Sequence, residues 1–144
     1  MSIQSLPVPP ARPLGPARRA ASVLPQRLGW AVAATVLIAV TVFEARQHGG
    51  GVSAAAVFGG IGPDLTFLLA IGAGPTPHGV LPRRVVRPYN LAHHPLPPGL
   101  LLVAGALLPG APVAFVLALG WLAHITLDRA LGYGPRAADG SFAR

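Results

Sequence analysis

Two polar residues interrupt the last apolar stretch of the chain, His124 and Asp128, in the sequence WLAHITLD. If this stretch is helical, residues four apart lie on one face, with about 5–6 Å between their β-carbons. An imidazole nitrogen and a carboxylate oxygen placed in this way are ligands that zinc, manganese and iron accept. The spacing therefore predicts that His124 and Asp128 can reach one metal ion.

Three further residues of these types lie at the edges of other apolar stretches. Asp64 follows Pro63 inside the second stretch, and His93 and His94 precede the third. Ionisable side chains are costly in a membrane unless they are paired or hydrated, so they usually line a cavity or bind a ligand. We therefore expect one shared site for zinc or manganese, with candidate ligands Asp64, His93, His94, His124 and Asp128 and with Asp64, His124 and Asp128 as candidate catalytic residues.

Four of these five residues also have a simple structural interpretation, and His124 is the exception because its position inside the apolar stretch has no evident need for polarity. Asp64 is placed to cap the second half of a broken helix, since carboxylates accept hydrogen bonds from free backbone N–H groups there. His93 and His94 are suited to the headgroup region of a bilayer. Asp128 is suited to the polar end of the last helix. The metal interpretation depends on three separate stretches delivering His or Asp to one place.

The composition indicates that lipid surrounds these elements. Only 10% of the 144 residues are charged and 52% are hydrophobic, whereas a soluble domain carries about 25% charged residues. The chain has no cysteine, which excludes disulfides and thiolate metal sites. The eleven basic residues flank apolar runs, so we expect no nucleic-acid partner.

The hydropathy pattern predicts an all-α integral membrane protein with about four short transmembrane helices. We expect a disordered Pro- and Arg-rich tail over 1–27, a four-helix membrane domain over 28–134 and a short tail over 135–144. Proline removes a backbone donor and bends a helix, so the second helix should break at Gly62 and Pro63. The third, over about 98–108, is too short to cross alone, and 109–112 should form a turn before the fourth, over about 113–131.

The arginines predict an orientation. With four crossings and a cytoplasmic N-terminus, ten of the eleven arginines lie inside and only Arg46 lies outside, which agrees with the positive-inside rule. We therefore expect a multi-pass protein of the cell inner membrane with both termini in the cytoplasm. Four short helices bury little surface, so a homodimer or a membrane partner protein is also plausible.

Three motifs in order resemble one bacterial family. These are Pro63-Asp64-Leu65, then YNLAHH from Tyr89 to His94, then GWLAHI with DRALGYG from Gly120 to Gly134. Over about 28–134 the chain resembles the small membrane proteins called domain of unknown function 4260, which implies four apolar segments but no established activity. The order of the motifs is also loosely similar to proteins assigned as membrane-bound metal-dependent hydrolases.

Two functions remain open at this level. In the first, the cluster is a metal-dependent hydrolase site for a lipid or phosphate-containing substrate, with Tyr89, Asn90 and Arg129 as substrate-binding residues and Arg83, Arg84 and Arg87 attracting an anionic headgroup. In the second, the protein is not catalytic and its polar residues form a hydrogen-bond network between closely packed helices. Ion transport along the cluster is a third and weaker interpretation.

Overall fold

The structure, a computed structural model, describes residues 16–108 and 110–143. In chain order its helices are α1 (Pro16–His48), α2 (Gly50–Ile61), the 3-10 helix η1 (Gly62–Ala70), α3 (Arg83–Ala92), α4 (Leu96–Leu107) and α5 (Pro112–Leu131). Across the described residues the other regular feature is an isolated antiparallel bridge between Arg136 and Phe142. The predicted all-α fold class is confirmed.

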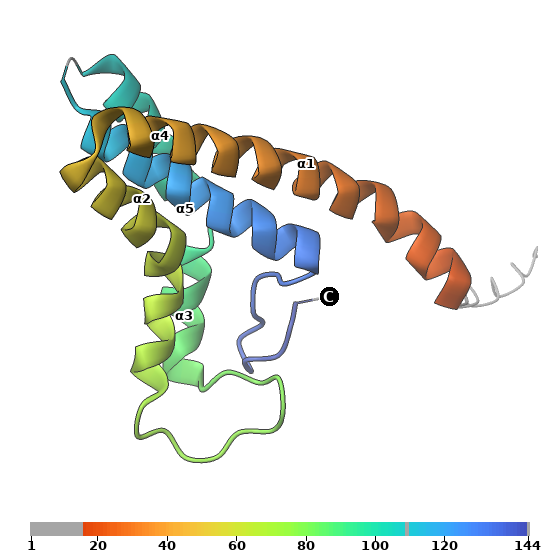
Figure 1. Ribbon diagram of the computed structural model, residues 1–144. Coiled ribbons are helices and arrows are strands. Elements are labelled where there is room, and N and C mark those ends of the chain that lie inside the picture. The colour runs from red at the N-terminus through yellow and green to blue at the C-terminus, as the bar shows by residue number, and fades with distance from the viewer. Residues whose placement is uncertain (1–15, 109, 144) are drawn as a thin grey trace, which may run out of the picture.

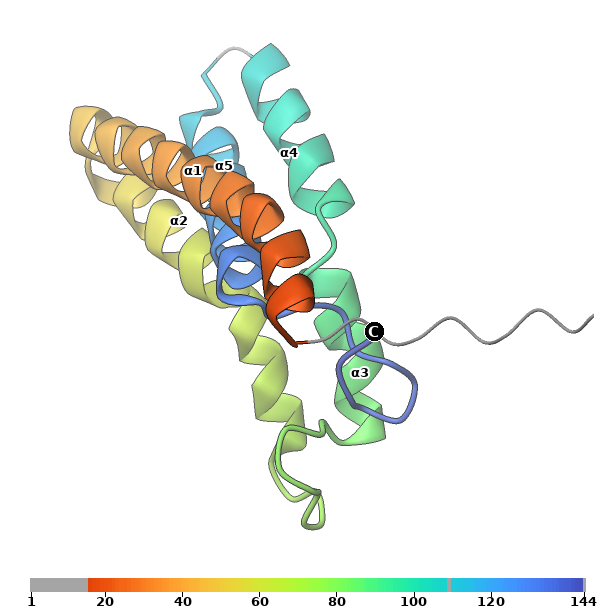
Figure 2. The ribbon, with the colours of Figure 1, turned by 90° about the vertical axis from the view of Figure 1, so that its right-hand side faces the viewer.

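Helix α5 lies at the centre of the molecule and contacts α1, α2 and α4 (Figures 1 and 2). Its inward positions are small or branched, including Val116, Ala118, Gly120 and Ala123, and these are buried. Helices η1 and α3 pair with each other and project from one end of the bundle. The candidate site residues therefore come from elements that meet near the C-terminal half of α5.

Three helical segments are long and apolar enough to cross a membrane: Val23–His48, Gly50–Ala70 and Pro112–Leu131. Large apolar side chains such as Val32, Val57 and Leu107 point outward, with 65%, 63% and 75% of their surface exposed. Outward apolar side chains over whole helices are expected where lipid is the solvent. Helix α4 has 12 residues and extends about 18 Å, so it is shorter than a bilayer core, as expected.

The predicted break in the second membrane segment is confirmed. Helix α2 ends at Ile61 and the chain continues as η1 from Gly62, with Pro63 in its first turn. Proline cannot donate the backbone hydrogen bond that would continue the α-helix. The Thr66 hydroxyl donates to the Pro63 carbonyl at 2.8 Å, which provides this carbonyl with a partner after the break.

The structure corrects three boundaries. Helix α1 begins at Pro16, so the tail predicted over 1–27 is wrong from Pro16 onward, while 1–15 lie outside the described residues. Proline is tolerated at the first position of a helix, and the alanine-rich sequence that follows favours one. The second correction is α3, a helix between the second and third membrane segments that the sequence did not predict; it is amphipathic, buries Val85 and Val86 and exposes Arg83 and Arg87.

The third correction concerns the residues after α5. Instead of a free tail over 135–144, the described residues fold back on the loop before α3: the Leu81 N–H donates to the Gly140 carbonyl at 3.0 Å. Gly140 has a φ of 91°, and a β-carbon there would collide with the Leu81 carbonyl oxygen. Glycine is therefore required at this contact.

Helices α2 and α5 approach closely because glycines face each other. A β-carbon on Gly120 would lie 2.7 Å from the Ala56 carbonyl oxygen, and one on Gly59 would collide with the Leu117 carbonyl oxygen. Where lipid is the solvent, such small residues drive helix association by letting backbones pack. This contact sets the position of His124, one turn further along α5.

We predict that Gly59→Ala lowers the thermal midpoint of the detergent-purified protein, because overpacking of a tight contact costs about 1–3 kcal/mol. The matched control is Gly60→Ala on the same helix, where an added β-carbon meets no atom within 4 Å. Alanine favours a helix over glycine by about 1 kcal/mol, so the control should keep or raise the midpoint. Equal midpoints for the two variants would show that this contact does not hold α2 against α5.

Candidate metal centre

Four of the predicted residues converge in space. Asp64 comes from the first turn of η1, His93 from the residue that ends α3, and His124 and Asp128 from successive turns of α5. The His93 Nε2 atom lies 3.5 Å from a carboxylate oxygen of Asp64 and 3.5 Å from one of Asp128. The corresponding distances from His124 Nε2 are 3.6 Å and 3.9 Å. The structure thus brings together residues that are up to 64 positions apart in the chain.

The two imidazoles present their Nε2 atoms to each other at 3.2 Å. Each Nδ1 atom faces a backbone carbonyl oxygen, that of Tyr89 at 2.9 Å for His93 and that of Gly60 at 2.8 Å for His124. A carbonyl oxygen only accepts, so each Nδ1 must carry the proton. A neutral imidazole has one N–H, so both Nε2 lone pairs point at the same small volume.

Such an arrangement is one that could hold a metal ion through two histidines. Metal-binding histidines usually donate their other N–H to a carbonyl or carboxylate, which fixes the ring. With bonds of about 2.0–2.1 Å from zinc to nitrogen or oxygen, two ligand atoms of a tetrahedral site lie about 3.3–3.4 Å apart. The Nε2 atoms and one Asp64 oxygen, separated by 3.2, 3.5 and 3.6 Å, come close to this spacing.

The ring of His93 is held tightly on its other side. His93 is 3% exposed, and the Tyr89 ring stacks on it with centroids 3.9 Å apart. Burial lowers the pKa of His93 below its ordinary value, although the hydrogen bond to the Tyr89 carbonyl and the Asp128 carboxylate oppose this shift. A neutral imidazole is the form that binds a metal ion, so the surroundings of His93 favour the required state.

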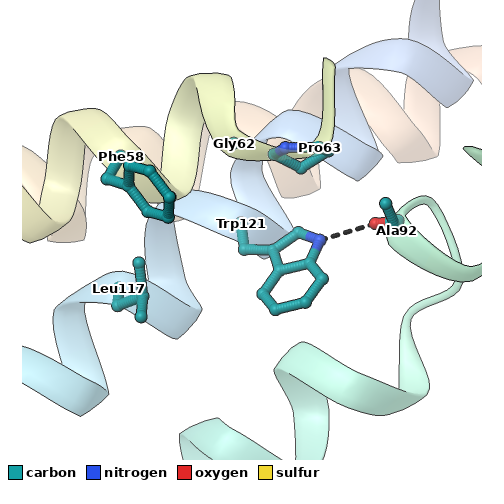
Figure 3. Close-up of a pocket in the computed structure, with 7 residues that line it drawn as sticks. Phe58, Gly62, Pro63, Ala92, Leu117 and Trp121 are labelled. Carbon is teal, nitrogen blue, oxygen red and sulfur yellow. Dashed lines mark hydrogen bonds between the residues drawn. The ribbon is translucent and has the colours of Figure 1, made fainter. Parts of the chain in front are cut away.

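Trp121 attaches the end of α3 to α5. Its Nε1–H donates to the Ala92 carbonyl at 2.6 Å, beside an apolar cavity of about 190 Å³ (Figure 3). Arg129 reaches the next carbonyl, that of His93, at 3.4 Å. Both donors come from α5, which also carries His124 and Asp128. The two histidines are therefore positioned against one rigid element.

The structure separates the two neighbouring histidines. His93 is buried in the cluster, whereas His94 is exposed and its Nδ1 accepts the Leu96 N–H at 3.2 Å where α4 begins. His94 therefore lies outside the group that could share an ion. The Asp64 carboxylate lies in the first turn of η1, against the two histidines.

The three predicted substrate-binding residues have contacts within the protein. Tyr89 is buried and stacks on His93. Asn90 donates to the Arg136 carbonyl at 2.8 Å and accepts the Arg136 N–H at 2.7 Å. Through these contacts Tyr89 and Asn90 position α3. Arg129 lies beside them.

Arg136 was not predicted as part of this region. Its guanidinium group lies 5.5 Å from the centre of the Tyr89 ring and 3.6 Å from that of Phe142. These contacts join the residues after α5 to the helix that carries His93. No local pattern predicts this pairing, because Asn90 and Arg136 are 46 positions apart.

Asn90→Ala should release the residues after α5 from α3. The change leaves the Arg136 N–H without its acceptor, a loss of about 1–3 kcal/mol. We expect hydrogen exchange at the Arg136 amide to accelerate at least about fivefold. Ser141→Ala is the control, because that hydroxyl bonds to Asp139 and not to α3. Unchanged protection of the Arg136 amide in Asn90→Ala would contradict this role.

Comparison with known proteins places the chain in a family. A family model described as a domain of unknown function, DUF4260, matches residues 31–143. No curated protein and no solved structure matches the chain, so the looser similarity to metal-dependent hydrolases gains no support. The matched region contains the whole His and Asp cluster together with the residues that fold back on α3. The chain therefore belongs to the DUF4260 family of domains of unknown function.

Proposed function

We propose that this membrane protein binds one divalent transition metal ion through Asp64, His93 and His124 and uses it for hydrolysis of a lipid or phosphate-containing substrate. The observation that supports the proposal best is the pair of Nε2 atoms 3.2 Å apart whose Nδ1 atoms both face carbonyl oxygens. Two lone pairs directed at one volume repel unless a cation lies between them. A metal ion satisfies both at once.

Zinc fits this set of ligands best. Two imidazole nitrogens and one carboxylate oxygen are a common set for catalytic zinc, with the fourth position open to water or substrate. Manganese prefers sites richer in oxygen. The Asp64 side chain is 51% exposed, so the cluster can be reached from water. Bound zinc would lower the pKa of a water molecule so that hydroxide is available near neutral pH.

Asp128 is suited to receive a proton. Its carboxylate is 3.5 Å and 3.9 Å from the two Nε2 atoms, yet it is not among the three residues whose ligand atoms all lie within 4.8 Å of one another. A carboxylate beside the ligands can take the proton from an attacking water molecule. In this assignment Asp64 holds the ion and Asp128 acts as the general base.

The surroundings favour a substrate with an apolar part. A cavity of about 240 Å³ lies between α1, α2 and α5, is lined mainly by apolar side chains and includes His124. The helices that line this cavity are apolar enough to lie in lipid. The arginine distribution supports placing this end of the protein at the cytoplasmic face of the inner membrane, with both termini inside.

A non-catalytic role is the second candidate, and the interhelical bonds favour it. The His124 bond to Gly60 and the Trp121 bond to Ala92 join α5 to α2 and α3, and such bonds contribute roughly 0.6–2 kcal/mol each in lipid. In this case a proton shared between the imidazoles would replace the metal ion. The protein would then be structural or would bind a partner, such as a second copy of itself.

Elemental analysis separates the two candidates. We expect about one equivalent of zinc on the detergent-purified protein after incubation with zinc and dialysis. Asp64→Asn and His93→Ala should each weaken zinc binding at least about tenfold, because each removes a ligand. His94→Ala is the control and should bind zinc as the parent does, since His94 lies outside the cluster. A monodisperse parent protein that binds no zinc would refute the metal proposal.

Asp128→Asn tests the hydrolytic step separately. The amide keeps the shape of the side chain but cannot accept the proton, so zinc should stay bound while kcat falls about 10²–10⁴-fold. The assay measures the release of a fluorophore from phosphodiester and lipid-ester substrates in mixed micelles. Parental turnover by zinc-loaded Asp128→Asn would exclude Asp128 as the general base.

A further inference from the structure

A further cavity lies away from the His and Asp cluster. It has a volume of about 410 Å³ and lies between α3 and the residues after α5, with Val86 and Ala138 in its lining. Arginines from both sides line it: Arg83 and Arg87 from α3, and Arg136 from the returning segment, together with Asn90. None of these residues belongs to the proposed metal site.

Arg136 is held rigidly in this cavity. Its backbone N–H donates to Asn90, one terminal nitrogen donates to the Gly79 carbonyl at 2.7 Å, and its guanidinium lies over the Phe142 ring. These contacts fix the Arg136 guanidinium group at the lining of the cavity.

In the described part of the chain no carboxylate lies within 4.0 Å of the nitrogen atoms of these arginines. There, every ion pair within 4.0 Å joins a histidine to an acid, and no arginine takes part. Asp139 is the acid near the cavity, and the hydroxyl and N–H of Ser141 already bond to its carboxylate. Three arginines against this one acid leave the cavity with a net positive charge that an anion can balance.

We propose that this cavity binds a phosphate group. Guanidinium groups match the oxygens of phosphate with paired hydrogen bonds, and here one group is fixed while Arg83 and Arg87, one turn apart on α3, can close over the ligand. Helix α3, which lines the cavity, lies at one end of the helices that are apolar enough to cross a membrane (Figure 2). The phosphate is that of an anionic lipid headgroup or of a small soluble phosphate, and the two sources are distinguishable.

Arg84 provides a matched control on the same helix. Its guanidinium donates to the Ile71 carbonyl at 2.7 Å, and it does not line the cavity. Arg87→Gln and Arg84→Gln remove the same charge from neighbouring exposed positions. A difference in phosphate or lipid binding between the two variants therefore shows that the cavity is involved. An equal change in binding shows only an effect of the overall charge of the protein.

The experiment compares lipid binding by the full chain in detergent, measured by native mass spectrometry with phosphatidylglycerol and with phosphatidylcholine. A parallel arm measures the thermal midpoint with inorganic phosphate against chloride at equal ionic strength. Because one arginine near a membrane surface contributes about 1 kcal/mol to binding of anionic lipid, Arg87→Gln should reduce phosphatidylglycerol binding roughly fivefold. Arg84→Gln should retain it.

The outcomes separate the sources of the phosphate. A phosphatidylglycerol preference that Arg87→Gln loses and Arg84→Gln keeps identifies a lipid headgroup. A soluble phosphate is identified if inorganic phosphate raises the thermal midpoint, if Arg87→Gln loses this stabilisation while Arg84→Gln keeps it, and if the protein shows no preference between the two lipids. Equal behaviour of the two variants toward both ligands would overturn the proposal. None of these readouts depends on zinc, so the metal proposal can fail while this one stands.

Discussion

The structure depends on two imidazoles whose coordinating nitrogens face each other. The carbonyl oxygens of Tyr89 and Gly60 accept a hydrogen bond from the single N–H of each neutral ring, so the Nε2 lone pairs of His93 and His124 face each other at 3.2 Å. Two lone pairs at this distance repel each other, which is why we propose that a cation lies between them. The nearby carboxylates of Asp64 and Asp128 make the same volume attractive to a divalent ion.

The helices around this pair fix its geometry. Helix α5 carries His124 and is held against α2 by facing glycines, so the Gly60 carbonyl comes within reach of the ring. The break at Pro63 ends α2 just before Asp64 and turns that carboxylate toward the histidines. On the third side, Tyr89 stacks on His93, and Asn90 anchors the residues that return after α5. Together these contacts position the side chains of His124, Asp64 and His93.

The sequence predicted the parts of this arrangement that have local causes. Proline at position 63 breaks a helix wherever it occurs, and the spacing of His124 and Asp128 places both on one helical face. The selection between His93 and His94 was not predictable, because it depends on how α3 packs. Helix α3 itself was missed because a short stretch with three arginines and Pro88 resembles a loop. The contact between Asn90 and Arg136 is long-range and has no signal in either segment.

X-ray absorption spectroscopy of the zinc-loaded protein tests the central claim most directly, because it reports the atoms bound to the metal. We predict a first shell of nitrogen and oxygen at about 2.0–2.1 Å, with outer scattering from two imidazole rings that falls to one ring in His93→Ala. A first shell without imidazole scattering, or a spectrum that His93→Ala leaves unchanged, would contradict the assignment of His93 and His124 as ligands.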